Sequence, residues 1–168
     1  MQAIASDRSL SQTDLQVQFD SVHDTLANLC LGPAGLEIGA VDPEKVLIAN
    51  TVPYLSGGVF ASKTTAEVAF TATVHDIPAD AVLVQSAAYL MTLDDAGAET
   101  LTMGAIADGA TPLLPERPAS GTPIGYVVIA VDAGATSFDA TTDELSEGHL
   151  TVTYVDLGYL APRFDIAQ

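Results

Sequence analysis

The sequence is poor in basic residues. It carries 5 Lys and Arg against 22 Asp and Glu, a formal charge of −17 at pH 7 over 168 residues. Electrostatic binding to nucleic acid needs clustered Lys and Arg, so we expect no nucleic-acid partner. Disordered acidic tails combine high charge with low hydrophobicity, whereas 48% of these residues are hydrophobic and only 16% are charged. The composition therefore indicates a folded acidic protein whose copies repel one another unless they meet through apolar surfaces or in salt.

Cysteine is almost absent. Cys30 is single, which excludes an intrachain disulfide and a multi-cysteine metal site, and its neighbours Leu29 and Leu31 predict a buried, unreactive thiol. No uncharged apolar stretch of about 18 residues occurs, so we expect no membrane partner. Residues 1–10 show no signal-peptide pattern, which favours a cytosol-like compartment or release by lysis.

Apolar residues recur at helical spacing near the N-terminus. The intervals are four, three, four and three residues, an average of 3.5 that is typical of a narrow helix–helix seam. The seam residues are Leu15, Phe19, Val22, Leu26 and Leu29. Gly32 and Pro33 would end this helix. Two interpretations stay open: the helix packs on its own domain, or it contacts another subunit.

After a Gly- and Pro-bearing connector at 32–44 the apolar period changes to two. Hairpins are predicted around Ser56–Gly58 and Asp94–Gly97, and a Pro-rich loop is predicted over 108–123. The remaining predicted strands are 45–52, 59–62, 67–74, 82–93, 99–106, 124–131, 136–139 and 149–157. We therefore expect a mainly β protein, an antiparallel β-sandwich or barrel with an N-terminal α-helix arm. The expected domains are 1–44, the helical arm and linker, and 45–168, the antiparallel β domain. Residues 1–32 should then be removable without unfolding the β domain.

Signatures of catalysis are lacking. The sequence has no phosphate-binding glycine loop and no nucleophile elbow, and His23, His75 and His149 lie in unrelated segments. Asp94 and Asp95 lie in a turn, where Asp is favoured for local hydrogen bonds. The absence of Trp argues against a sugar-cleaving cleft. We expect no enzyme, no catalytic residues, no cofactor and no metal site.

One segment resembles a known group of proteins. Residues 114–129 read Leu-Pro-Glu-Arg-Pro-Ala-Ser-Gly-Thr-Pro-Ile-Gly-Tyr-Val-Val-Ile, and the stretches Val59–Thr64 and Val68–Ala72 add to the pattern. This pattern resembles virion proteins of tailed bacteriophages, particularly capsid decoration (cement) and head-fibre proteins, over roughly Lys45 to Leu157.

The resemblance implies a structural protein that binds the outer surface of a phage head. Such a protein assembles as a homotrimer, contacts the major capsid protein and resides in the virion after assembly in the host cytoplasm. The expected interface residues are Leu15, Phe19, Val22, Leu26, Leu29, Pro115, Pro118 and Pro123. The alternatives are another virion part (tail, baseplate or fibre adaptor) and a carbohydrate- or ion-binding surface module of a saline organism.

Overall fold

The computed structural model is mainly β, and its strands pair antiparallel. It describes residues 16, 19, 22, 23, 26–109, 111–117, 120–135 and 137–158. The strands are β1 (Leu36–Ile38), β2 (Val46–Ile48), β3 (Val52–Ser56), β4 (Val59–Lys63), β5 (Ala66–Val68), β6 (Gln85–Leu93), β7 (Glu99–Met103), β8 (Ala107–Asp108), β9 (Thr122–Val131) and β10 (Leu150–Asp156). The predicted antiparallel β architecture is thus confirmed.

The larger sheet is built around β6. Its strand order is β10-β9-β6-β7, and β8 also pairs with β6. All nine residues of β6 are buried, which matches a central strand covered on both faces. β9 pairs with β6 on one side and with β10 on the other, so the β6-β9-β10 ladder forms the centre of the large sheet.

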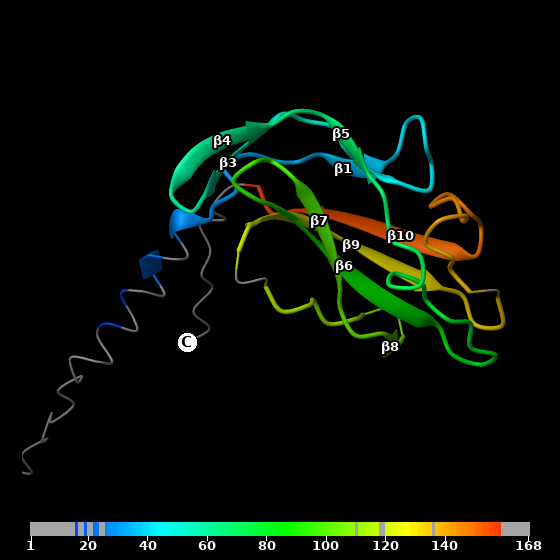
Figure 1. Ribbon diagram of the computed structural model, residues 1–168. Helices are drawn as coiled ribbons and strands as arrows, with labels where there is room; N and C mark the ends of the chain where they lie inside the picture. The colour runs from blue at the N-terminus through cyan, green and yellow to red at the C-terminus, as the bar shows by residue number, and fades with distance from the viewer. Residues whose placement is uncertain are drawn as a thin grey trace, which may run out of the picture.

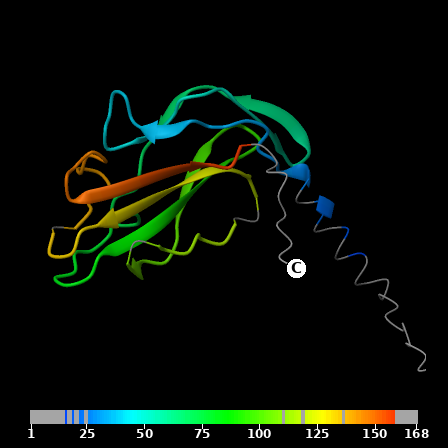
Figure 2. The ribbon, with the colours of Figure 1, turned by 180° about the vertical axis from the view of Figure 1, so that it is seen from behind.

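A second layer covers one face of the large sheet. It consists of the sheet β1-β2-β5 and the hairpin β3-β4 (Figure 1; the reverse side is shown in Figure 2). Side chains from both layers meet in the core, among them Ile48 and Tyr54 from one layer and Met91 and Ile129 from the other. Burial of these apolar residues is the main stabilising contribution.

Leu36 of β1 lies close to Gly125 of β9. A Cβ atom built on Gly125 would lie 2.4 Å from Leu36 Cδ1 and 2.7 Å from the Val155 carbonyl oxygen. A side chain at residue 125 would therefore displace the Leu36 side chain and clash with the backbone of the neighbouring strand β10.

Both predicted hairpins are confirmed. Ser56 pairs with Val59 across the turn Gly57-Gly58, and both glycines have positive φ, 57° and 78°. This is the conformation that two-residue hairpin turns require and that glycine adopts without steric cost. Leu93 pairs with Glu99 across the second turn.

Other predicted strands are shorter than expected. β5 ends at Val68 rather than continuing to residue 74, because the chain turns over 71–75, where the Thr71 carbonyl accepts a bond from the His75 amide. The predicted strand 136–139 is reduced to a single bridge between Phe138 and Ile77. Alternating apolar residues bury side chains in such turns as well, so the period alone overstates strand length.

The predicted loop ends earlier than expected, because β9 begins at Thr122 and includes Pro123. Proline cannot donate to a strand ladder. The register with β6 shifts here: Met91 pairs with Gly125 but Thr92 with Pro123, leaving Ile124 extra on β9. This bulge places the proline where the regular ladder is interrupted.

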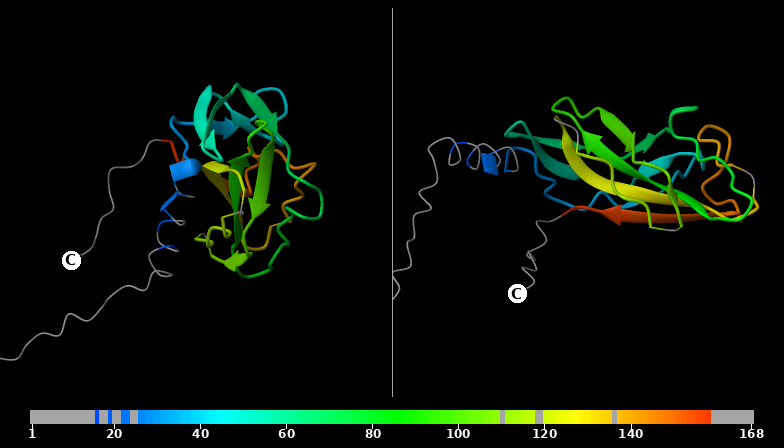
Figure 3. Two further views of the ribbon diagram at one scale, coloured as in Figure 1. Left: turned by 60° about the vertical axis from the view of Figure 1, so that its left-hand side comes forward. Right: turned by 90° about the horizontal axis from the view of Figure 1, so that it is seen from below.

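Part of the predicted linker is strand. β1 pairs with β2, so the expected boundary between residues 44 and 45 falls between two paired strands. Further upstream, Cys30 forms a bridge with Tyr54 of β3. The predicted helical arm lies mostly outside the described residues, and no helix can be defined from the few that are described. Figure 3 shows the start of the continuously described chain, residues 26–30, beside the β3–β4 hairpin, where Gly58 N donates to the Ala27 carbonyl.

Candidate functional site

Three of the four seam residues that the structure describes are exposed to solvent. Phe19, Val22 and Leu26 are 69%, 55% and 54% exposed. Leu29 is half-buried, and its backbone exchanges two hydrogen bonds with Leu55 of β3, of 3.1 and 2.8 Å. Leu15 lies outside the described residues. The seam is therefore divided: its last member belongs to the β domain, and the three before it face solvent.

The Pro-rich loop reaches the same end of the molecule. Arg117 Nη2 donates to the Asn28 carbonyl oxygen at 3.4 Å, next to the last seam residue. Pro115 is half-buried against Gly104, where a Cβ atom would lie 3.3 Å from Pro115 Cδ. Pro123 is half-buried within β9, and Pro118 lies outside the described residues. Structure thus brings two of the predicted interface segments together at one point of contact.

The β3–β4 turn completes this end. Gly58 N donates to the Ala27 carbonyl at 2.8 Å, and Gly57 N donates to Asn28 Oδ1 at 2.9 Å. Directly after the turn, Val59 and Phe60 are 62% and 65% exposed. We call the exposed residues Phe19, Val22, Leu26, Val59 and Phe60 the apolar end.

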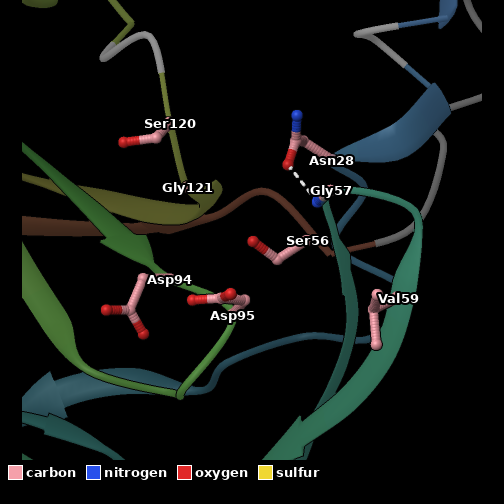
Figure 4. A pocket seen from close by; sticks show the side chains of 8 residues that line it. All are labelled: Asn28, Ser56, Gly57, Val59, Asp94, Asp95, Ser120 and Gly121. Carbon is pink, nitrogen blue, oxygen red and sulfur yellow. Dashed lines mark hydrogen bonds between the residues drawn. The ribbon is translucent and has the colours of Figure 1, made fainter.

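Beside the apolar end lies an open hollow of about 500 Å³. Four chain segments contribute to it: the base of the arm, the β3–β4 turn, the β6–β7 turn and the two residues before β9 (Figure 4). The lining residues are Asn28, Ser56, Gly57, Val59, Asp94, Asp95, Ser120 and Gly121. Because hairpin turns from both layers meet here, the hollow depends on the packing of the layers.

The two aspartates of the hollow have different roles. Asp94 Oδ1 accepts hydrogen bonds from the amides of Ala96 and Ala98 at 2.9 and 2.7 Å, so this carboxylate holds its turn. The Tyr54 hydroxyl donates to the Asp94 carbonyl at 2.9 Å. Burial, followed by the charges of Asp94 and Asp95, raises the pKa of Tyr54. Asp95 is exposed and makes no hydrogen bond or ion pair within the part of the chain that the structure describes.

Comparisons of this chain with protein-family models, curated proteins and solved structures found no match. Any function must therefore be argued from the geometry of the site. The sequence patterns do not single out Ser56, Val59 or Phe60 as interface or pocket residues: all three belong to a predicted hairpin, and Val59 and Phe60 enter otherwise only through the resemblance. A Gly-Gly turn directly followed by two large apolar residues is the signal that would have found the last two.

The histidines and the cysteine occupy separate environments. His75 is 4% exposed, and its ring lies edge-on to Phe70 and Tyr89. His149 Nδ1 lies 3.3 Å from Glu147 Oε2. Cys30 is buried, and burial raises its pKa, so this thiol is held in its unreactive form. Within the described ranges, no three His, Cys, Asp or Glu residues are grouped to hold a metal ion, and no helix there could span a membrane.

Proposed function

We propose that the protein is a tailed-phage capsid decoration protein, a non-enzymatic homotrimer that binds the outside of the head and connects neighbouring major-capsid subunits. The observation that carries this proposal is the apolar end. Exposed apolar side chains that lie together mark interaction surfaces; Phe19, Val22 and Leu26 recur at helical spacing, and each is more than half exposed. Burying them between copies or against the shell would oppose the pressure of packaged DNA.

In this proposal the fold is a β-sandwich with an N-terminal helical arm that binds in trans. The seam spacing supports the helix. The exposure of its described members supports contact with another subunit over packing on the same domain. Leu29 and Cys30 anchor the base of the arm to β3, so the arm has a fixed origin from which to reach a partner.

The distribution of charge supports an outer position. Of the cations in the described ranges, Lys45 pairs with Asp42 and Lys63 with Glu99, which leaves Arg117 at the apolar end without an ion pair. A surface of this sign is repelled by packaged DNA. Attachment then has to rely on apolar contact and on cations that the shell supplies.

The experiment is a triple substitution in the seam, Phe19→Ser, Val22→Ser and Leu26→Ser. We expect the unaltered protein to show a light-scattering mass of three times 17.3 kDa and to decorate purified heads. The triple variant should be monomeric and fail to decorate, with its unfolding midpoint unchanged, because these side chains are already in solvent. The matched control is Val41→Ser with Val82→Ser, which are 80% and 78% exposed and lie away from the apolar end; it should behave like the unaltered protein.

Two results would contradict the proposal. A monomeric unaltered protein that ignores heads would overturn it outright. Labelled protein seen by electron microscopy at a single vertex, instead of over the whole head, would identify a tail, baseplate or adaptor protein.

A further inference from the structure

Ser56 is a buried polar residue with an unusual environment. It is the last residue of β3 and is only 5% exposed, yet it lines the hollow. Figure 4 shows its side chain directed into the space between Asn28, Asp95 and Ser120. Within the described chain its hydroxyl makes no hydrogen bond. The fully buried side-chain atoms without a partner in the described residues are His149 Nε2 and the Tyr154 hydroxyl, so the Ser56 hydroxyl is reached from the hollow. It is therefore free to bond a polar occupant there.

The charge of the hollow selects the sign of that occupant. Asp94 and Asp95 lie on one wall, and the lining contains no basic residue. Arg117 contacts only the backbone oxygen of Asn28 at the rim and is not part of the lining. An incoming cation therefore has two carboxylates to approach, one of them unengaged, and a hydroxyl oxygen that accepts a hydrogen bond.

The size of the hollow and the residues that line it favour a basic side chain as the occupant rather than a metal ion. Calcium is held by six to eight oxygens at about 2.3–2.6 Å, which requires a compact cage of ligands. The hollow has a volume of about 500 Å³, far more than such a cage encloses. Asn28 Oδ1 is already used by the Gly57 amide. Val59 supplies an apolar wall, against which the methylene stem of Arg or Lys can pack while its charged head reaches the carboxylates.

We propose that the hollow receives an arginine or lysine side chain of the protein partner on which this chain docks. The charge of −17 disfavours a second copy of this acidic chain as the occupant and makes a different, basic protein the complementary one. Of the described cations, Lys45 and Lys63 form internal ion pairs, and Arg117 already donates to the Asn28 carbonyl. This inference depends on the proposed function in one respect only, the location of the partner on the phage head. The apolar end provides contact area, and the hollow fixes the position of the partner and recognises its charge.

The test is an NMR titration of the full chain with N-acetyl-arginine amide, N-acetyl-lysine amide and, as an uncharged probe, N-acetyl-norleucine amide. We expect both cationic probes to shift the amide signals of Gly57, Asp95 and Gly121 but not that of Gly134, and norleucine amide to shift none. Asp95→Asn should weaken binding about two- to fivefold, as for an exposed ion pair. Ser56→Ala should weaken it by a similar factor without lowering the unfolding midpoint, because its hydroxyl has no internal partner.

The matched control is Asp132→Asn, which removes the same charge from an exposed residue outside the hollow. If it weakens binding as much as Asp95→Asn does, general negative charge attracts the probe and the proposal is overturned. Calcium shifting the same signals at micromolar concentration would overturn it in favour of a metal site. Failure to decorate heads together with site-specific arginine binding would contradict the proposed function alone; decoration without such binding would contradict only this inference.

Discussion

His75 is the buried titratable residue whose environment is best defined. Its Nδ1 accepts a hydrogen bond from the Thr71 amide at 2.9 Å, and its backbone oxygen accepts one from the Tyr89 hydroxyl at 2.7 Å. An imidazole nitrogen accepts only when it is unprotonated. The neighbouring Thr73 has a φ of 62°, a conformation that costs a non-glycine residue about 1–2 kcal/mol. His75 thus holds a strained turn in place as a neutral side chain.

Stability should therefore fall in mild acid. Burial lowers the pKa of His75, only partly offset by a hydrogen bond to the Leu101 backbone and the charge of Asp76. In the unfolded chain the pKa of this histidine is about 6.5. Below that pH the unfolded chain binds a proton at His75, whereas the folded chain does not yet bind one. Stability is fully present above that pH and is lost below it, by up to about 1.4 kcal/mol per pH unit until the folded-state pKa is reached. Urea unfolding midpoints between about pH 7.5 and about pH 5.5 measure this.

The diagnostic variant is His75→Asn, whose side-chain oxygen can accept the Thr71 bond without titrating. It should flatten the pH dependence in this window. His149→Asn is the matched control for loss of one histidine outside the aromatic cluster. Equal slopes for His75→Asn and the unaltered protein would show that other groups cause the acid sensitivity.

At the level of elements, the segment before β1 divides at Ala27. Leu29 and Leu31 make three backbone hydrogen bonds with β3, and Cys30 is buried between them. This short stretch acts as an additional strand on the edge of the β3–β4 hairpin. Removal of residues 1–32, which the sequence predicts to leave the β domain folded, would therefore also remove contacts that stabilise β3.

Two truncations separate these parts. Deleting residues 1–25 should change the free energy of unfolding by less than about 0.5 kcal/mol while abolishing association. Deleting 1–32 should cost about 2–4 kcal/mol, from three backbone hydrogen bonds worth about 0.5–1.5 kcal/mol each and the lost burial of Cys30. Equal urea midpoints for the two truncations would contradict the assignment of 29–31 to the β domain.

For the whole molecule, the balance between repulsion and apolar contact governs association. The charge of −17 opposes contact between copies, whereas the apolar end favours it. Salt shortens the screening length from about 10 Å at 0.1 M to about 3 Å at 1 M. It weakens the repulsion and leaves hydrophobic contact intact.

The mass measured by light scattering should therefore rise toward the trimer as sodium chloride increases from about 0.1 M to about 1 M. The seam triple variant, which has the same charge, should stay monomeric throughout. A mass that falls with salt would mean that ion pairs, not apolar side chains, join the copies.

Local patterns predicted the class of fold and its hairpins well. The turns Gly57-Gly58 and Asp94–Gly97 depend on residue types that few other conformations favour, so the sequence alone located them. The patterns failed at 32–44, 67–74 and 136–139. There a buried residue such as Leu36 or Phe138 could belong equally to a strand or to a packed turn, and long-range pairing decided between them.

Only part of the candidate site could be predicted from the sequence. The seam spacing marked Phe19, Val22 and Leu26, but spacing does not tell whether a face packs on its own domain. Ser56 and Asp95 are 39 residues apart in the sequence, and nothing local connects them. They line one hollow because β3 and β6 belong to different layers whose turns meet at one end.

The sequence by itself determined the sign of the surface, the β class, the hairpin turns and the inert cysteine, because each follows from composition or from neighbouring residues. Only the tertiary structure decided where the arm joins the β domain, which apolar side chains stay in solvent, and that a buried hydroxyl and two carboxylates share a hollow. These depend on contacts between distant segments, whose free energy is realised only when both layers have packed.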